Sequence, residues 1–468
     1  MDIKLTFCGA AGNVTGSRYL LQANGRSVYV DCGLFQEWKY KKRNWEPFAI
    51  PAADTDAVVL THGHLDHCGL IPRLVRKGFA GRVLCTAATA DIAGIVMSDA
   101  GRIQEEDARF KAKRHRREGR EGAGPKEPLF TSDDAEQARS FLQPCPFDTE
   151  VPVTEGITAT FFSAGHILGA ASVALHVDDG VESRIIVFSG DLGPWDMPIL
   201  EDPVPPVKAD YVLVESTYGD KDHPTLEPVE DQLARVVNET YTAGGNLVIP
   251  SFAVERAQDI LYHLGGLLHA GRIPKLKVFL DSPMAISVTD VFMRNRDLFD
   301  EETMEMVLRG EHPCDFPGLA FSRTRDESKA IADEKKPVII IAGSGMCTAG
   351  RVKHHLVHNI GRPEATVLFV GYQASGTLGR NIVSGDPEVR IFGQHHKVRA
   401  RIEQIHGFSA HAGRSDLKRW LSSFETPPRK VFVTHGEPDA AEPFAELIRS
   451  ELGYQAMRPE YGETVELE

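Results

Sequence analysis

Short apolar runs that each end in a polar residue recur along the first 220 residues and once more near residue 435. The six runs are SVYVDCG, VVLTHGH, TFFSAGH, IVFSGD, VLVESTYG and VFVTHGE. Their apolar, β-branched and aromatic content predicts buried strands, and the polar residue falls where each strand would end. Open sheets build their sites at the carboxyl ends of strands, and a neighbouring glycine lets the backbone approach closely. The pattern therefore predicts one site assembled from several strand ends.

A second repeating pattern occupies the segment between the fifth and the sixth run. Four segments each begin with an apolar strand, pass through a turn rich in Gly, Ser or Pro, and continue as a helical pattern; they start at GGNLVIP, KVFLDSP, PVIIIAG and TVLFVGY. Repeated βα units predict a parallel sheet with helices on its faces. We therefore expect a first domain in two pieces, 1–215 and 395–468, with a second α/β domain inserted at 216–394.

Composition narrows the class of protein only a little. The chain has 468 residues, which is too many for one hydrophobic core. Its net charge of −14 argues against a protein that coats nucleic acid in general, but not against a nuclease with a local basic cleft. The seven cysteines are scattered and form no CxxC pair, which favours a reducing cytoplasm. The sequence shows no signal peptide and no apolar run long enough to span a membrane, so we expect no membrane partner.

The charged segment 104–128 predicts an exposed helix that runs into a loop. It is either a solvated excursion or an arm that contacts phosphates. The arm would use Lys111, Lys113, Arg114, Arg116, Arg117 and Arg120.

The stretch THGHLDH carries the strongest chemical signal. His62 and His64 can face one ion from a strand-end loop, and Asp66 with His67, one turn later, can face a second. Burying these groups without metal or partners would cost several kcal/mol. Further ligands must come from the other strand ends, namely His166, Asp191 and His435. Asp191 suits a bridge because its two oxygens can each take one metal, while Asp31 is expected to orient the histidine loop from behind.

The same motifs, in the same order, resemble a known family. VYVDCG, THGHLDH, SAGHILGAAS and FSGDLG resemble the four motifs of the metallo-β-lactamase fold, and VESTYGD, GFSAHAGRSDL and VTHGEP resemble motifs A, B and C of its β-CASP branch. The resemblance implies an αββα metallo-β-lactamase sandwich with an inserted β-CASP domain, a Rossmann-like α/β domain with a parallel sheet. It also implies two zinc ions and hydrolysis of nucleic-acid phosphodiesters.

Each position then receives an expected role. The resemblance implies one zinc on His62, His64, His166 and Asp191, and a second on Asp66, His67, Asp191 and His435. The implied catalytic residues are His411, Glu215 and Asp66. His411 would act as general acid beside a hydroxide activated by two metals, with Glu215 orienting it.

Histidine rather than valine at motif C, His435, points to the RNA-acting group. We therefore expect a cytoplasmic zinc-dependent ribonuclease that acts on single-stranded RNA, as endonuclease or 5′-exonuclease, and that can form a homodimer.

Each of the two predicted substrate-contact segments has two interpretations. The loop GSGMCTAGR is either a plain tight turn or a loop that brings Ser344 near an RNA phosphate. The run HHKVRAR, with Lys397, Arg399 and Arg401, is either a solvated strand face or a phosphate contact.

Three alternatives to a ribonuclease stay open. A DNA-acting β-CASP nuclease and a small-molecule hydrolase on the same sandwich are the two enzymatic ones. A non-catalytic RNA-binding subunit is the third, and the complete set of ligand positions argues against it.

Overall fold

The computed structural model describes residues 2–118, 127–223 and 227–468. The chain divides into two compact units. Unit 1 contains residues 1–197, 201–222 and 411–468, and unit 2 contains residues 198–200 and 223–410. No helix in these described ranges combines the length and the apolar character needed to cross a bilayer.

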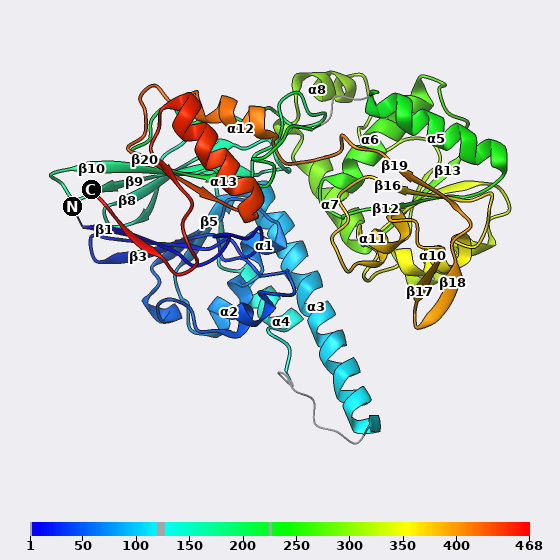
Figure 1. Cartoon of the computed structure of the whole chain (residues 1–468), viewed down its shortest axis with the longest axis horizontal. Coiled ribbons are helices and arrows are strands. Elements are labelled where there is room, and N and C mark those ends of the chain that lie inside the picture. Colours follow the sequence, from blue (N-terminus) through cyan, green and yellow to red (C-terminus); the bar gives the residue numbers. More distant parts are fainter. Residues whose placement is uncertain (1, 119–126, 224–226) are drawn as a thin grey trace. The chain divides into compact units, whose positions relative to one another are not determined.

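Unit 1 is built on two seven-stranded mixed sheets that pack face to face (Figure 1). Apolar side chains from the inner faces of both sheets, among them Phe7, Phe161 and Phe432, form one buried cluster. The first sheet has the order β22 (Thr464–Leu467), β1 (Ile3–Phe7), β2 (Tyr19–Ala23), β3 (Arg26–Val30), β4 (Ala57–Val59), β5 (Arg82–Thr86) and β6 (Leu142–Cys145). The second has the order β21 (Ala456–Met457), β20 (Lys430–Thr434), β11 (Tyr211–Glu215), β10 (Ser183–Phe188), β9 (Ala171–Asp178), β8 (Ile157–Ser163) and β7 (Val151–Thr154).

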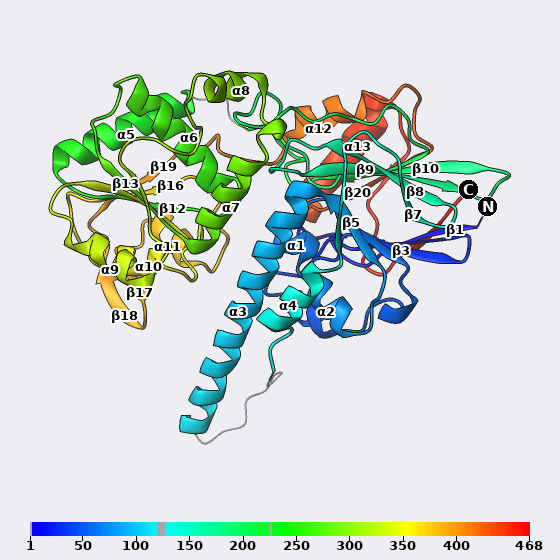
Figure 2. The same cartoon turned by 180° about the vertical axis from the view of Figure 1, so that it is seen from behind.

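Helices cover the outer face of each sheet of unit 1, as Figure 2 shows from behind. The first sheet carries α1 (Leu65–Cys68), α2 (Ile71–Arg76), α3 (Ala87–Glu118) and α4 (Ser132–Arg139), and the second carries α12 (Arg414–Leu421) and α13 (Pro438–Leu447). This arrangement confirms the predicted αββα sandwich. All six predicted strands form, and each ends at its polar residue or within three residues before it.

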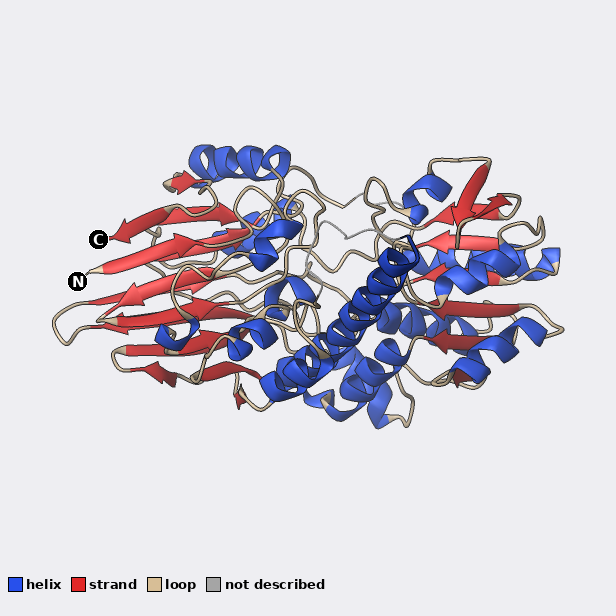
Figure 3. Cartoon of the chain, turned by 90° about the horizontal axis from the view of Figure 1, so that it is seen from below, coloured by secondary structure: helices blue, strands red, loops and turns tan. Residues whose placement is uncertain are grey.

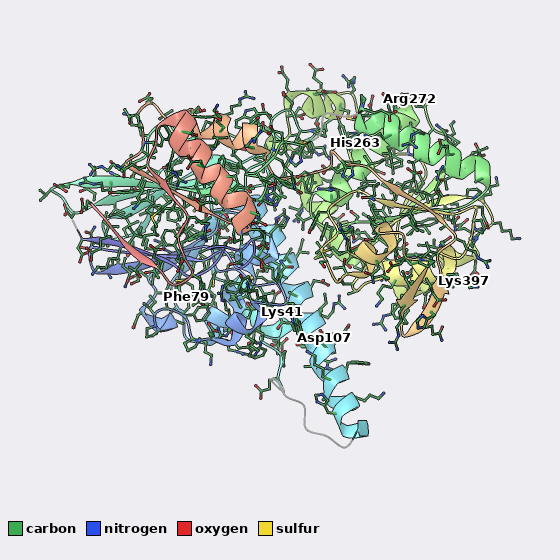
Figure 4. The ribbon with its side chains drawn as sticks, in the orientation of Figure 1. Lys41, Phe79, Asp107, His263, Arg272 and Lys397 are labelled. Atoms are coloured by element: carbon green, nitrogen blue, oxygen red, sulfur yellow. The ribbon has the colours of Figure 1, made fainter. Side chains whose placement is uncertain are left out.

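The long helix α3 is half supported and half exposed. Its first part packs on α4, and Glu105 accepts hydrogen bonds from the backbone and hydroxyl of Ser132 at 3.0 and 2.9 Å. Beyond this point the helix projects from unit 1, with Asp107 on the projecting part (Figure 4). Lys111 and Lys113 are exposed there, Arg120 lies outside the described residues, and the side chains of Arg114, Arg116 and Arg117 are not described.

Unit 2 holds a six-stranded sheet in which every pair of neighbours is parallel, as the βα rhythm predicts. Its order is β14 (Leu319–Phe321), β13 (Lys277–Asp281), β15 (Val338–Ala342), β12 (Leu247–Pro250), β16 (Thr366–Phe369) and β19 (Arg401–Gln404). Helices lie on both faces of this sheet (Figure 3). They are α5 (Val229–Ala243), α6 (Arg256–His269), α7 (Pro283–Arg294), α8 (Glu301–Leu308), α9 (Arg325–Ala330), α10 (Val352–Asn359) and α11 (Leu378–Val383), and a hairpin of β17 (Glu388–Ile391) and β18 (Gln394–Lys397) follows.

The boundaries of the units differ from the expected 215/216 and 394/395. The second one falls between Ala410 and His411. The physical reason is that residues 401–404 form β19, which pairs in parallel with β16 and so extends the sheet of unit 2. The first boundary falls after Asp222, because the turn that follows β11 still packs in unit 1.

Candidate metal centre and active site

Strand direction gathers the predicted polar residues at one edge of unit 1. In the second sheet β8, β10, β11 and β20 all run the same way, so their carboxyl ends lie together. β20 pairs with β11 so that Thr434 lies opposite Glu215, although about half the chain separates them. His435 therefore joins the cluster through strand pairing.

Four of the predicted ligands form a first group. His62, His64, His166 and Asp191 each offer a ligand atom, and these atoms all lie within 4.8 Å of one another. His64 Nδ1 lies 3.1 Å from both His62 Nε2 and His166 Nε2. Asp191 Oδ2 lies 3.4 Å from His62 Nε2 and 3.6 Å from His166 Nε2.

A second group lies on the other side of Asp191. It consists of Asp66, His67 and His435, whose ligand atoms also lie within 4.8 Å of one another. The other carboxylate oxygen, Asp191 Oδ1, lies 3.2 Å from His67 Nε2 and 3.5 Å from His435 Nε2. The two oxygens of Asp191 thus face different groups, which is the arrangement of a bridging carboxylate.

The spacing of these donors fits a divalent cation. Two ligand atoms of a tetrahedral zinc ion, with bonds of about 2.0–2.1 Å, lie about 3.3–3.4 Å apart. The two nitrogen pairs that include His64 are each 3.1 Å apart, and Asp191 Oδ1 is buried without a hydrogen bond in the described part of the chain. A buried carboxylate oxygen that accepts no hydrogen bond is costly unless a cation compensates it.

The protonation states of the first group point the same way. Burial and the neighbouring His67 lower the pKa of His62 to about 3, and burial lowers the pKa of His64 to about 4. Burial also lowers the pKa of His166 well below its ordinary value. These rings are therefore neutral at neutral pH, which is the form that binds a metal. Burial alone would raise the pKa of Asp191. The neighbouring histidines outweigh burial, with the largest effects from His435 and His67, and hold that pKa well below its ordinary value.

The carboxylate of Asp31 lies behind one candidate ligand of the second group. Its Oδ2 lies 2.7 Å from His67 Nδ1, which leaves Nε2 of the same ring toward Asp191. The carboxylate of Asp31 also accepts hydrogen bonds from the backbone and hydroxyl of Thr61 at 2.8–3.1 Å.

Sequence reasoning missed Thr61 and Thr217. Thr217 Oγ1 lies 3.1 Å from His435 Nδ1. Thr61 directly precedes the predicted ligand His62 in THGH, and Thr217 follows the predicted acid Glu215 by two residues in EST. These positions are the signal that could have found them.

A glycine next to a strand end lets one motif approach another. Gly33 follows Asp31 by two residues, and a methyl group there would overlap the carbonyl oxygen of Asp66. The backbone is held at the same place, because Cys32 N donates to His67 O at 2.7 Å. The loop that carries Asp31 and the loop that carries Asp66 and His67 can pack only because residue 33 has no side chain.

His411 and Glu215 form a separate pair beside the two groups. His411 Nδ1 lies 3.1 Å from Glu215 Oε1, and His411 Nε2 lies 4.0 Å from Asp191 Oδ2. Glu215 is fully buried, and its carboxylate also accepts hydrogen bonds from the backbone of Leu192 and Thr217. The His411 side chain is 22% exposed, so this imidazole can meet a substrate while the carboxylate behind it stays fixed.

Burial lowers the pKa of His411, but the carboxylates of Glu215, Asp191 and Asp66 outweigh it and raise that pKa to about 9. His411 is therefore protonated at neutral pH and can donate a proton from Nε2. Asp66, expected in both a ligand and a catalytic role, sits in the second group with Oδ2 3.7 Å from His435 Nε2.

The predicted substrate residues do not come together. Ser344 follows β15 at the carboxyl edge of the parallel sheet, and its hydroxyl closes its own loop onto Ala349. Arg401 begins β19 at the opposite edge, where it pairs with Glu239. The run HHKVRAR is two strands rather than one, because β18 ends at Lys397 (Figure 4) and Arg399 lies in the link to β19.

The fold and the site define a metallo-β-lactamase sandwich with a metal-binding cluster at its strand ends. The profile of the metallo-beta-lactamase superfamily matches residues 11–216, that of the Beta-Casp domain residues 257–382, and that of the Zn-dependent metallo-hydrolase RNA specificity domain residues 395–459. The chain is 38% identical to "Ribonuclease TTHA0252" of Thermus thermophilus over 98% of each chain. It is 31% identical to "Transcription termination factor FttA" of Methanocaldococcus jannaschii, over 96% of this chain and 69% of that protein.

A crystal structure of a protein of unknown function from Enterococcus faecalis V583 shares the fold alone, with a TM-score of 0.55 at 12% identity and full coverage of both chains. The match to the Thermus protein over nearly the whole length decides the family. The chain belongs to the β-CASP branch of the metallo-β-lactamase superfamily, a family of metal-dependent hydrolases.

Proposed function

We propose that this protein is a ribonuclease that holds two zinc ions and hydrolyses phosphodiester bonds of single-stranded RNA. The observation that carries the proposal is a carboxylate, Asp191, placed between two groups of ligand atoms, with the imidazole of His411 beside it. Hydrolysis of a phosphodiester needs stabilisation of charge on the phosphoryl oxygens and a proton for the leaving oxygen, and the cluster contains groups for both tasks.

The residues divide between two zinc positions. His62, His64 and His166 would hold one ion and Asp66, His67 and His435 the other, with one oxygen of Asp191 on each. Bound zinc supplies Lewis-acid stabilisation of the phosphoryl oxygens and a strong nucleophile at neutral pH. Asp31 contributes by fixing the ring of His67 in the orientation that turns Nε2 inward.

His411 supplies the proton in this proposal. Its Nδ1 faces Glu215 and its Nε2 faces the ligand cluster, so Nε2 is the atom that donates to the leaving sugar oxygen. Glu215 keeps the imidazole charged and oriented, because a nearby carboxylate stabilises the imidazolium. The expected products are a 3′-hydroxyl and a 5′-phosphate.

Two observations favour RNA over DNA. The profile that matches residues 395–459 is described as an RNA specificity domain, and the Thermus relative carries the name ribonuclease. Histidine at position 435, at the place of motif C, agrees with them.

The first test is metal content together with cleavage. Protein purified without chelator should hold about two zinc ions per chain and should cut end-labelled and internally labelled single-stranded RNA faster than matched DNA. His64→Ala should lose zinc and cleavage. The matched control is His176→Ala, a partly exposed histidine on β9 outside the cluster, which should keep both. Protein with only trace zinc, or with equal or faster cleavage of DNA, would contradict the proposal.

A further inference from the structure

Two aromatic rings stand exposed at the carboxyl edge of the parallel sheet of unit 2. Phe252 lies in the loop after β12 and is 44% exposed, and Tyr372 lies in the loop after β16 and is 68% exposed. β12 and β16 are neighbouring parallel strands, so these loops leave the sheet side by side at the same edge. Single exposed apolar residues are common, but this edge is where open parallel sheets bind ligands.

The loops that carry the two rings are tied together. Arg256, just after the first loop, donates a hydrogen bond to the carbonyl of Val370, at the start of the second. Gln373, next to Tyr372, is buried, and its Nε2 donates to Gly345 O in the loop after β15 at 3.1 Å. Three adjacent loops thus form one connected surface.

Phe252 rests directly on this surface. A methyl group on Gly345 would lie 2.8 Å from Cδ2 and Cε2 of the Phe252 ring, so the ring packs against bare backbone. Neither Phe252 nor Tyr372 is in contact with another aromatic ring within the described ranges. We call Phe252, Gly345, Tyr372 and Gln373 the aromatic platform. The ring of Phe252 rests on the loop that carries Gly345, and both rings are exposed to a flat ligand.

We propose that Phe252 and Tyr372 bind unpaired bases of single-stranded RNA by stacking, an inference that rests on the ribonuclease function proposed above. Proteins that bind single strands without reading their sequence use exposed aromatic rings in this way, because every base has a π-face. A preformed platform avoids the entropy cost of ordering the rings when RNA binds.

The chain connects this edge to the catalytic pair. β19 lies beside β16 and ends at Gln404, and His411 follows only seven residues later. Phe408, between them, is buried in unit 2 and packs 5.5 Å from the ring of His263. RNA bound to the aromatic platform would thus contact loops of the unit 2 sheet. The chain leaves this same sheet shortly before it reaches His411.

Two other exposed aromatic residues of unit 2 provide matched controls. Tyr241 is 45% exposed near the end of α5, whose following turn enters β12 at its amino end. Phe392 is 54% exposed at the tip of the β17–β18 hairpin, where its ring lies 4.6 Å from that of His354. Both differ from the platform rings in position and not in chemical type.

The test compares the double variant Phe252→Leu/Tyr372→Leu with the double control Tyr241→Leu/Phe392→Leu. Leucine keeps apolar volume and removes the flat ring. We expect the platform variant to bind a single-stranded RNA oligomer with a Kd raised about tenfold for each ring, measured by fluorescence anisotropy. Zinc content and hydrolysis of a nitrophenyl phosphodiester should match those of the unmodified protein, and Phe252→Trp should keep RNA binding.

An abasic oligomer separates stacking from backbone contacts. The unmodified protein should bind abasic RNA about as weakly as the platform variant binds ordinary RNA, and the variant should lose little more. Equal binding of RNA by the platform variant and the unmodified protein overturns the inference while leaving the ribonuclease function intact. An equal loss in the control variant also overturns it. Failure of the unmodified protein to bind single-stranded RNA at all overturns both proposals.

Discussion

At the scale of single residues, the proposed roles of metal binding and proton donation fall on different side chains. Asp191 faces a histidine group with each of its oxygens, whereas His411 faces Asp191 at 4.0 Å and is held by Glu215. His64 belongs to the first group and is mostly enclosed. Substitution of His64 and of His411 should therefore give different kinds of defect.

We predict that His411→Ala keeps zinc and binds RNA but cuts it poorly. General acid catalysis typically contributes about 10²–10⁴-fold to a rate. The defect should shrink on a nitrophenyl phosphodiester, whose leaving group needs no proton, whereas His64→Ala should fail on both substrates. An equal loss on the two substrates, with zinc intact, would instead make His411 a residue that positions substrate.

The pH profile reports on Glu215. A general acid must be protonated, so we expect activity to fall as the pH rises through the pKa of His411, which is raised to about 9 although burial alone would lower it. Bound cations would offset the charges of Asp191 and Asp66 and leave Glu215 as the main stabilising neighbour. Glu215→Gln should therefore move the alkaline limb of kcat to lower pH, measured on RNA at saturating zinc. A limb that stays in place would show that another group sets it.

At the scale of elements, strand ends and close backbone contacts form the site. β3 and β4 are parallel neighbours, and the loops after them meet where Gly33 lies under the carbonyl of Asp66. Parallel strands place these loops at one edge, but their contact depends on a residue without a side chain. The metal cluster is thus sensitive to a position that binds no metal.

Gly33→Ala should destabilise unit 1 and weaken zinc binding. The added methyl group would overlap Asp66 O, and overpacking of this kind typically costs about 1–3 kcal/mol. Urea unfolding and zinc content would measure the two effects. Gly266→Ala is the control, because it lies on an exposed position of α6 with nothing within 4 Å and should stabilise by up to about 1 kcal/mol. An unchanged midpoint for Gly33→Ala would contradict the close contact.

At the scale of the whole molecule, the metal cluster lies entirely in unit 1, and unit 2 has its own two hydrophobic clusters. All four tryptophans, Trp38, Trp45, Trp195 and Trp420, also belong to unit 1. Tryptophan fluorescence therefore reports on the unit that would hold the metal.

Removal of zinc with a chelator should lower the unfolding midpoint seen by tryptophan fluorescence, and added zinc should restore it. A ligand at 100 times its Kd stabilises the folded state by about 2.7 kcal/mol. Hydrogen exchange provides the control: amides of β4 and β20 should exchange faster after chelation, whereas those of β12 and β15 should not change. Equal changes in both units would contradict a cluster confined to unit 1.

The sequence by itself determined the strands, the family and the chemistry of the ligands. Alternation, apolar runs and a polar residue at each strand end are local properties, so SVYVDCG or IVFSGD could be interpreted without a partner strand. The parallel sheet of unit 2 followed in the same way from its repeated βα units. The identity of each strand-end residue then limited the site to metal chemistry.

Only the tertiary structure decided which of these residues meet. Pairing of β20 with β11 brings His435 beside Glu215, and strand direction puts Ser344 and Arg401 at opposite edges of their sheet. The contact of Asp31 with His67 and the contact of Phe252 with Gly345 depend on loops that converge from distant parts of the chain. The physical reason is that a sequence pattern has a range of a few residues, whereas pairing and loop contacts form between segments tens to hundreds of residues apart.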